Sequence, residues 1–175
     1  MEALEQQVPF ENPSQEFFKG EEGNLKQVSL ITAKNGDQFN LLCTEVSPVE
    51  VDGMPRLGYF ARYFITDNKG VAFCNFWVEN RMEDLVQISA ENNNPFLQGQ
   101  GLITSGLRQV VKDVFREGIF DGKPGKNGLL QIDLIELAIE TDNIASQRTA
   151  IKNGFTYDAS TKTASLTRSD YLASK

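Results

Sequence analysis

Apolar and polar residues alternate along the first half of the chain, which is the pattern of strands that have one buried face. The alternating segments are rich in Val, Ile, Phe and Tyr and cover residues 27–33, 38–46, 57–65, 71–78 and 85–90. The turn signals KNGD and TDNKG connect the first two segments, and then the third and fourth, in the manner of β-hairpins. The first half therefore predicts a sheet of mainly antiparallel strands.

The period changes after residue 102, where apolar residues recur at spacings of three and four. This spacing predicts an amphipathic helix that ends near Gly118. Its apolar positions are Ile103, Leu107, Val110, Val111 and Val114. After the loop DGKPGKNG, residues 129–139 predict a strand whose alternation slips at Leu134 and Ile135, as it would at a bulge.

The remaining segments complete the expected domain. A short helix over residues 144–154 ends in Asn153-Gly154, a common helix stop, and the tail over residues 155–172 predicts one more hairpin. Residues 1–25 predict a short helix or a loose arm. Since no repeat or linker divides the chain, we expect one α/β (α+β) domain over residues 1–175, with a mixed, mostly antiparallel central sheet flanked by helices.

Composition narrows the possible partners and chemistry. The chain has 17 basic and 24 acidic residues and a net charge of −7, which argues against general binding to nucleic acid or anionic membranes. No segment approaches the roughly 20 apolar residues of a membrane helix, and the start carries no signal-peptide pattern. Cys43 and Cys74 lie in strand-like segments, so we expect buried free thiols and a cytoplasmic protein. The absence of histidine excludes Ser-His-Asp and Cys-His catalysis and most zinc sites, and we expect no metal.

The stretch NPFLQGQGLIT, residues 94–104, places two glycines immediately before the predicted helix. Glycine permits a sharp turn, and a helix start offers unpaired N–H groups and a positive dipole end, so the stretch is either an anion site or an ordinary turn. It lacks the three spaced glycines of a Rossmann fingerprint and the Lys-Ser or Lys-Thr of a Walker loop.

A second stretch decides between these two interpretations. ETDNIASQRTAIKNGF, residues 140–155, contains the spaced residues Asn143, Ser146, Arg148, Gly154 and Phe155. Together with Gln98-Gly99-Gln100-Gly101 and Pro95, this order resembles the GNAT family of acetyl-CoA-dependent N-acetyltransferases, and most of all its ribosomal-protein alanine N-acetyltransferase branch. The resemblance covers roughly residues 83–172.

The resemblance implies a site and a fold. Acetyl-CoA is the implied co-substrate, with its pantetheine arm in an opening between splayed strands that end near Asn93 and Ile139. The implied cofactor-binding residues are Asn93, Gln98, Gly99, Gln100, Gly101, Leu102, Ile103, Thr104, Asn143, Ser146 and Arg148. The candidate catalytic residues are Glu91 as base, Ser146 as acid and Asn143 as a thiol contact, and Glu79 and Glu140 are weaker candidates for the base. Each of these residues also has a purely structural interpretation that does not depend on the family. Asn143 is then a helix cap with Ser146 in the first turn. Glu91 is a solvated residue at a strand end, and Arg148 pairs with an acid on its own helix.

Two departures from the family pattern bear on activity. Ile103 stands where the family prefers glycine or alanine, and Ala150 stands where many members carry the tyrosine that protonates the leaving thiolate. The expected function is direct acetyl transfer to an amine, either a protein N-terminus or a small molecule, with a homodimer possible. The alternatives are an inactive acyl-CoA-binding or protein-interaction module of the same fold, and a plain antiparallel protein whose resemblance is accidental.

Overall fold

The computed structural model of the chain describes residues 26–43, 47–51, 54–80, 84–92, 99–117, 119–120 and 129–175. Its strands are β1 (Lys26–Thr32), β2 (Gln38–Cys43), β3 (Ser47–Val51), β4 (Met54–Thr66), β5 (Ala72–Asn80), β6 (Leu85–Asn92), β7 (Ile119–Phe120), β8 (Leu129–Leu130), β9 (Leu134–Ala138), β10 (Thr156–Asp158) and β11 (Thr163–Thr167). Its helices are α2 (Leu102–Glu117), α3 (Ile144–Lys152) and α4 (Arg168–Ala173). The arm predicted over residues 1–25 lies outside the described residues.

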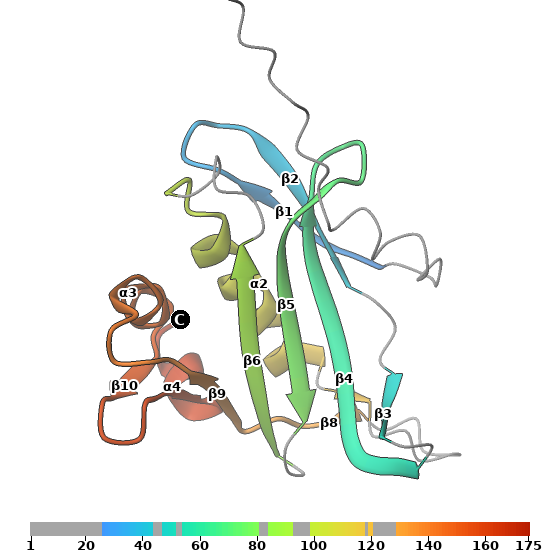
Figure 1. Ribbon diagram of the computed structural model, residues 1–175, viewed down its shortest axis with the longest axis vertical. Helices are drawn as coiled ribbons and strands as arrows, with labels where there is room; N and C mark the ends of the chain where they lie inside the picture. Colours follow the sequence, from blue (N-terminus) through green and yellow to red (C-terminus); the bar gives the residue numbers. More distant parts are fainter. Residues whose placement is uncertain are drawn as a thin grey trace, which may run out of the picture.

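The main sheet has the strand order β1-β2-β4-β5-β6-β9-β11-β10, with β3 paired to β4 at its side (Figure 1). The pair β6 and β9 is parallel, and the other described pairs are antiparallel. The two hairpins predicted from KNGD and TDNKG are β1–β2 and β4–β5, and both are confirmed. The sheet is therefore mixed and mostly antiparallel, as the pattern of the sequence predicts.

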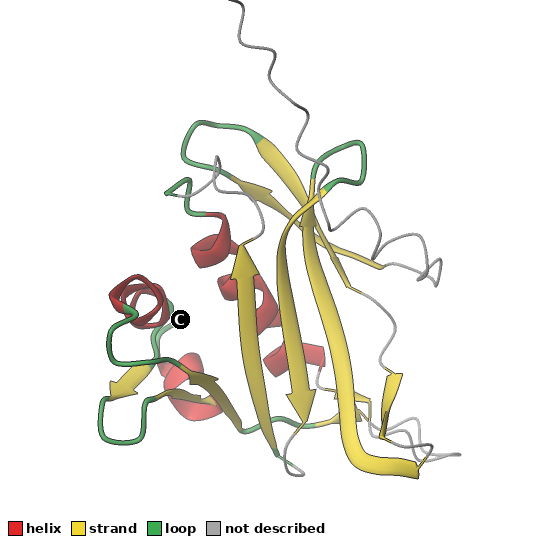
Figure 2. Ribbon diagram, in the orientation of Figure 1, coloured by secondary structure: helices red, strands yellow, loops and turns green. Residues whose placement is uncertain are grey.

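Helix α2 packs on one face of this sheet, against β1, β4 and β5 (Figure 2). Four of the five predicted apolar positions are buried, namely Leu107, Val110, Val111 and Val114, and Leu102 and Phe115 are buried with them, whereas Ile103 is only partly buried. Gly106 lets the helix approach closely, because a Cβ at this position would lie 2.7 Å from Ile65 Cδ1 and 2.7 Å from Phe76 Cζ. Both of those side chains are fully buried, so the contact between helix and sheet is tight at this point.

Two predicted elements differ from the structure. The strand expected over residues 129–139 is two strands, β8 and β9, with a break at residues 131–133 where Ile132 turns into the core. This break explains why the alternation of apolar and polar residues slips at Leu134 and Ile135. The bulge predicted at Leu134 is wrong, since β9 pairs with β11 in continuous register.

The tail does form the predicted hairpin, β10–β11, but it then continues into helix α4, which the sequence analysis missed. Thr167 caps α4, and its side chain accepts a hydrogen bond from the backbone N–H of Asp170. This Thr-x-x-Asp spacing is a helix-start signal. The helix has six residues, too few for an apolar period to show.

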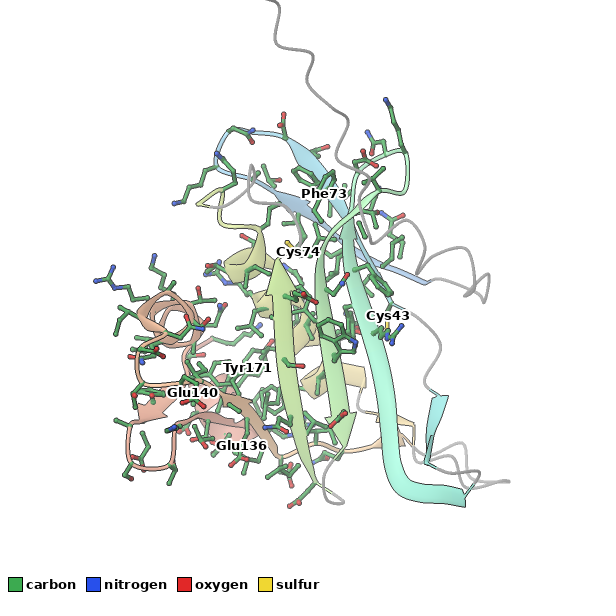
Figure 3. All side chains as sticks on the ribbon, in the orientation of Figure 1. Cys43, Phe73, Cys74, Glu136, Glu140 and Tyr171 are labelled. Carbon is green, nitrogen blue, oxygen red and sulfur yellow. The ribbon has the colours of Figure 1, made fainter. Side chains whose placement is uncertain are left out.

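The two cysteines, labelled in Figure 3, are free and buried, as predicted. Cys43 lies on β2 and Cys74 on β5, and β4 runs between these strands. A tyrosine on β4 joins the sheet to α2, because the Tyr63 hydroxyl donates a hydrogen bond of 2.9 Å to the Asp113 carboxylate. None of the described helices is long and apolar enough to cross a membrane.

Candidate functional site

The parallel strands β6 and β9 separate soon after they meet (Figure 1). Their pairing consists of Leu85 with Leu134, Val86 with Ile135 and Gln87 with Glu136. Beyond this point β6 stays paired to β5 as far as Asn92, and β9 stays paired to β11. The edge of β6 from Ile88 onward therefore faces an opening in place of a neighbouring strand, and alternate backbone N–H and C=O groups point into it.

A narrow pocket of about 160 Å³ occupies this opening. Ile88, Ser89 and Ala90 line one wall, and Leu137, Ala138 and Ile139 line the other. Ile103 and Leu107 of α2, together with Asn143, Ser146 and Thr149, complete its lining. The splayed strands expected between the ends near Asn93 and Ile139 are thus present, and they come from divergence after Gln87 and Glu136.

The narrow pocket adjoins a wider groove of about 570 Å³ at the start of α2. The two cavities share the lining residues Ala90, Ile103, Asn143, Ser146 and Thr149. The groove adds the loop over residues 99–101, the first turn of α2, one face of α3 and the turn after β1. The two cavities therefore lie side by side, one at a helix N-terminus and the other in the split sheet.

The two glycines of the loop have left-handed backbone conformations, with φ of 82° at Gly99 and 79° at Gly101. A Cβ at Gly99 would meet nothing within 4 Å, and one at Gly101 would meet only the Lys34 side chain, at 3.6 Å. The glycines are therefore required by the turn itself. The loop is held in place by the backbone N–H of Lys34, which donates to the carbonyl of Gln100 at 3.0 Å.

The N–H groups at the start of α2 point along the helix axis toward the groove. Gly101 supplies the carbonyl that receives the first helical hydrogen bond, from Ser105. The N–H groups of the residues before Ser105 have no partner within the helix, as at every helix start. Leu102, Ile103 and Thr104 line the groove, so the positive end of the helix dipole lies at its wall.

Asn143 and Ser146 form the N-terminal turn of α3. The Asn143 side-chain oxygen accepts a hydrogen bond of 3.1 Å from the backbone N–H of Ser146, so Asn143 is the cap that the sequence allows. Both residues also line the narrow pocket and the groove. Capping and a place at the cavity are therefore compatible in this fold.

Helices α2 and α3 meet in the wall of the groove. The hydroxyls of Thr104 and Thr149 are 3.4 Å apart. The Asn153 side-chain amide donates to the carbonyls of Thr104 and Thr149, at 3.1 and 3.0 Å, whereas its oxygen is buried with no partner in the described part of the chain. The sequence shows Asn153 only as a helix stop and carries no signal for this junction.

Two lysines supply the charge of the groove. Lys34, from the turn after β1, and Lys152, from the last turn of α3, both line it, and the described lining of the two cavities includes no carboxylate. Sequence reasoning missed both residues, because they lie in segments far apart along the chain. Because both lysines line the groove together with the N-terminus of α2, the groove is electropositive although the protein as a whole is acidic.

The remaining predicted residues lie as follows. Glu91 is exposed on β6 and does not line either cavity, although its neighbour Ala90 lines both. Arg148 is exposed on α3 and also stays off the lining, and α3 has no acid with which it could pair. Glu140 forms an ion pair of 2.6 Å with Lys162. Asn93, Gln98 and Pro95 lie outside the described residues.

Position 150, where the resemblance implies a tyrosine, is closed to solvent. Ala150 is fully buried on the inner face of α3. Nearby, the Tyr157 hydroxyl donates to the carbonyl of Ile139 at 3.1 Å, so it is committed to the sheet. The hydroxyls that line the narrow pocket are those of Ser89, Ser146 and Thr149.

By sequence, the chain matches no protein-family model and has no significant match among curated proteins. Its fold is nevertheless similar to those of solved N-acetyltransferases. The aminoglycoside acetyltransferase AAC(6')-Ib in complex with coenzyme A is 16% identical, with 65% of this chain and 69% of that chain covered and a TM-score of 0.51. A second structure of that enzyme, with acetyl-CoA, is also 16% identical and has a TM-score of 0.52, with coverage of 66% and 69%.

Mutant forms of the spermidine/spermine N-acetyltransferase SpeG from Vibrio cholerae are 13% identical and have a TM-score of 0.52, with coverage of 69% and 72%. These enzymes share the GNAT acetyltransferase fold, and the present chain has the same class of fold. The sheet split between two parallel strands, with a helix start at its mouth, agrees with that assignment.

Proposed function

We propose that this protein is an acetyl-CoA-dependent N-acetyltransferase that transfers the acetyl group directly to an amine. The observation that carries the proposal is the pair of adjoining cavities, one at the first turn of α2 and the other in the opening between β6 and β9. The cavity at the start of α2 suits an anion, and the cavity between β6 and β9 suits a narrow chain that carries amides. Coenzyme A contains both groups, because its pyrophosphate is an anion and its pantetheine arm is a narrow chain with two amides.

In this proposal the pyrophosphate binds at the start of α2. A chain with a net charge of −7 cannot attract an anion by its overall charge, so binding depends on local groups. Backbone N–H groups over residues 101–104 and the ammonium groups of Lys34 and Lys152 supply them. The pantetheine amides pair with the exposed edge of β6 beyond Gln87, as an added strand would.

The chemical step is attack of a neutral amine on the thioester carbon. The new C–N bond forms, the C–S bond breaks, the amine loses a proton and the coenzyme leaves as a thiolate that takes one. Ser146 is the proposed proton donor to sulfur, and the free amide N–H groups of Asn143 are proposed to contact the thioester, since both residues line the narrow pocket. Glu91, one residue beyond the lining, is the proposed base and acts through water.

The acceptor we propose is an α-amine, in line with the resemblance to the ribosomal-protein alanine branch. With a pKa of about 7.8, an α-amine is neutral in roughly one molecule in ten at pH 7, whereas a lysine near 10.4 is neutral in roughly one in a few thousand. A cavity whose described lining has no carboxylate therefore favours the amine that needs the weaker base. Small-molecule amines such as polyamines are the second class to test.

One observation supports an inactive relative that only binds acyl-CoA. Ala150 is buried where many family members carry a catalytic tyrosine, and the described lining of the narrow pocket has no acid or base stronger than a hydroxyl. Such a protein would use the same groove and would bind acetyl-CoA without releasing thiol when amines are added.

Calorimetric titration of acetyl-CoA tests the binding step. The variant Gly101→Glu puts a carboxylate and a strained backbone at the groove, and we expect it to abolish binding. Gly70→Glu is the matched control, because Gly70 has a φ of 80° in the β4–β5 turn, away from the cavity. Loss of binding in both variants, or in neither, would contradict the proposed site.

Release of coenzyme A thiol in the presence of amines tests the reaction. The panel consists of peptides with free N-termini, the same peptides with blocked N-termini, and polyamines. Release with free N-termini alone supports the α-amine acceptor. Tight binding of acetyl-CoA with no release from any amine would favour the acyl-CoA-binding module.

A further inference from the structure

A second cavity lies outside the groove, where the outer face of α2 meets the end of α3 and the C-terminal helix α4. Its volume is about 560 Å³. Arg108 and Lys112 of α2, Lys152 of α3 and Lys175 line it, and its described lining has no Asp or Glu side chain. We call it the basic pocket. A pocket of this size is ample for a small-molecule ligand.

The concentration of positive charge in the basic pocket is unusual for this chain. The protein as a whole has 24 acidic and 17 basic residues. Arg108 and Lys112 are one helical turn apart, a spacing at which like charges destabilise a helix. No neighbour in the described chain relieves that repulsion, because the side chains of Arg108, Lys112 and Lys152 have no hydrogen-bond or ion-pair partner there.

The carboxylates nearest in sequence are engaged elsewhere. Asp113, next to Lys112, accepts the hydrogen bond from Tyr63 on the sheet side of α2. Asp170 of α4 accepts a hydrogen bond of 2.6 Å from the Thr167 hydroxyl. The cations of the basic pocket are therefore available to an anion from outside the chain.

The other walls of the basic pocket are partly apolar. Tyr171, labelled in Figure 3, packs against Phe115 with ring centroids 5.0 Å apart, and the Lys175 ammonium lies 4.5 Å from the centre of the Tyr171 ring. Val111 and Ile151 add aliphatic surface, and the Ile151 residue is 57% exposed. Cations beside an aromatic ring and aliphatic surface suit an anion attached to a flat organic group.

We propose that the basic pocket binds a phosphate monoester. Three ammonium groups and a guanidinium line the pocket and can neutralise its double charge, and Arg108 can bind two of its oxygens at once. Lys152 lines both the basic pocket and the groove, so the two cavities are neighbours. The phosphate is supplied either by the 3′-phosphate of coenzyme A bound in the groove or by a separate phosphorylated small molecule. The first source depends on the proposed function, and the second does not.

The test compares three ligands by calorimetry: acetyl-CoA, acetyl-dephospho-CoA, which lacks the 3′-phosphate, and adenosine 3′-phosphate alone. The test protein is the double variant Arg108→Gln, Lys112→Gln. Its control is Lys69→Gln, Lys162→Gln, which makes the same change in charge away from both cavities. All four side chains are exposed, and thermal unfolding checks that each variant folds.

If the coenzyme supplies the phosphate, the wild type and the control bind acetyl-CoA more tightly than acetyl-dephospho-CoA, by about tenfold to a hundredfold for two charge-assisted hydrogen bonds. The double variant loses this preference and binds both ligands with the affinity that the wild type has for acetyl-dephospho-CoA. If a separate molecule supplies it, adenosine 3′-phosphate binds to the wild type and to Gly101→Glu but not to the double variant.

The proposed phosphate site would be overturned if the wild type bound the two acetyl coenzymes with equal affinity and did not bind adenosine 3′-phosphate. The proposed function would remain intact in that case. Absence of binding by either coenzyme would reject the proposed function instead. In that case the basic pocket stands only if adenosine 3′-phosphate still binds and the double variant abolishes that binding.

Discussion

The side-chain amide of Asn153 donates a hydrogen bond to the backbone carbonyl of Thr104, with 3.1 Å between nitrogen and oxygen. A second bond from the same amide reaches the carbonyl of Thr149 at 3.0 Å. One side chain at the end of α3 therefore fastens that helix to the first turn of α2. Because both helices line the groove, this junction sets the distance between its walls.

Asn153→Ala is expected to lower the free energy of unfolding by about 1–3 kcal/mol, since it removes both part-buried hydrogen bonds from this amide. Asn153→Asp should cost more, because a carboxylate would face the same carbonyl oxygens. Urea unfolding measures both variants, and Asn68→Ala, in the exposed β4–β5 turn, is the control. If Asn153→Ala were as stable as the wild type, the hydrogen bonds of Asn153 would not hold α2 and α3 together at the groove.

Gly106→Ala is expected to destabilise the protein although alanine is the better helix former. The added methyl would lie 2.7 Å from Ile65 Cδ1 and Phe76 Cζ, and such overpacking costs about 1–3 kcal/mol against a gain in helix propensity of about 1 kcal/mol. The midpoint of urea unfolding measures the balance. Gln109→Ala, on the partly exposed side of α2, should have little effect, and a more stable Gly106→Ala would mean that α2 packs less closely than described.

Lys34→Gln is expected to weaken acetyl-CoA binding by about tenfold, the effect of one charge-assisted hydrogen bond. The affinity should also depend less steeply on salt, because one cation fewer meets the anion. Lys69→Gln, in the turn of the other hairpin, is the matched control. Calorimetry at two salt concentrations gives both quantities, and an unchanged affinity would exclude Lys34 from the anion site.

Stability is expected to fall as the pH rises above about 9. Burial raises the pKa of the Cys74 thiol from 9.0 to about 12, so the unfolded chain releases this proton first and gains stability relative to the native state. Burial, with the nearby Cys43 and Asp113, also raises the pKa of Tyr63. The Cys74 contribution, up to about 4 kcal/mol, is complete below pH 9 and is lost by pH 12.

Unfolding in urea at a series of pH values from 8 to about 12 measures this loss, and Cys74→Ala isolates the thiol. The variant should show a shallower decline over the same range, because Tyr63 still contributes but Cys74 no longer does. The thiols of the native wild type should also react slowly with a thiol reagent, since both are buried. An identical decline in the variant and the wild type would mean that Cys74 ionises as easily in the native state as in the unfolded chain.

Much of the fold was predictable because its signals are local. The β1–β2 and β4–β5 hairpins follow from turn residues next to alternating segments, and α2 follows from its own apolar period. The break between β8 and β9 was not predictable in this way. Ile132 is apolar in either arrangement, and only the surrounding core determines that it turns inward between two strands.

The candidate site divides along the same line. The sequence by itself determined the position of the glycine turn, the cap at Asn143 and the starts of α2 and α3, because these depend on the backbone preferences of neighbouring residues. Only the tertiary structure decided that β6 and β9 separate after Gln87, that Lys34 and Lys152 meet at one groove, and that Glu91 stays outside it. Those relationships depend on packing between segments far apart along the chain, for which one sequence carries no local signal.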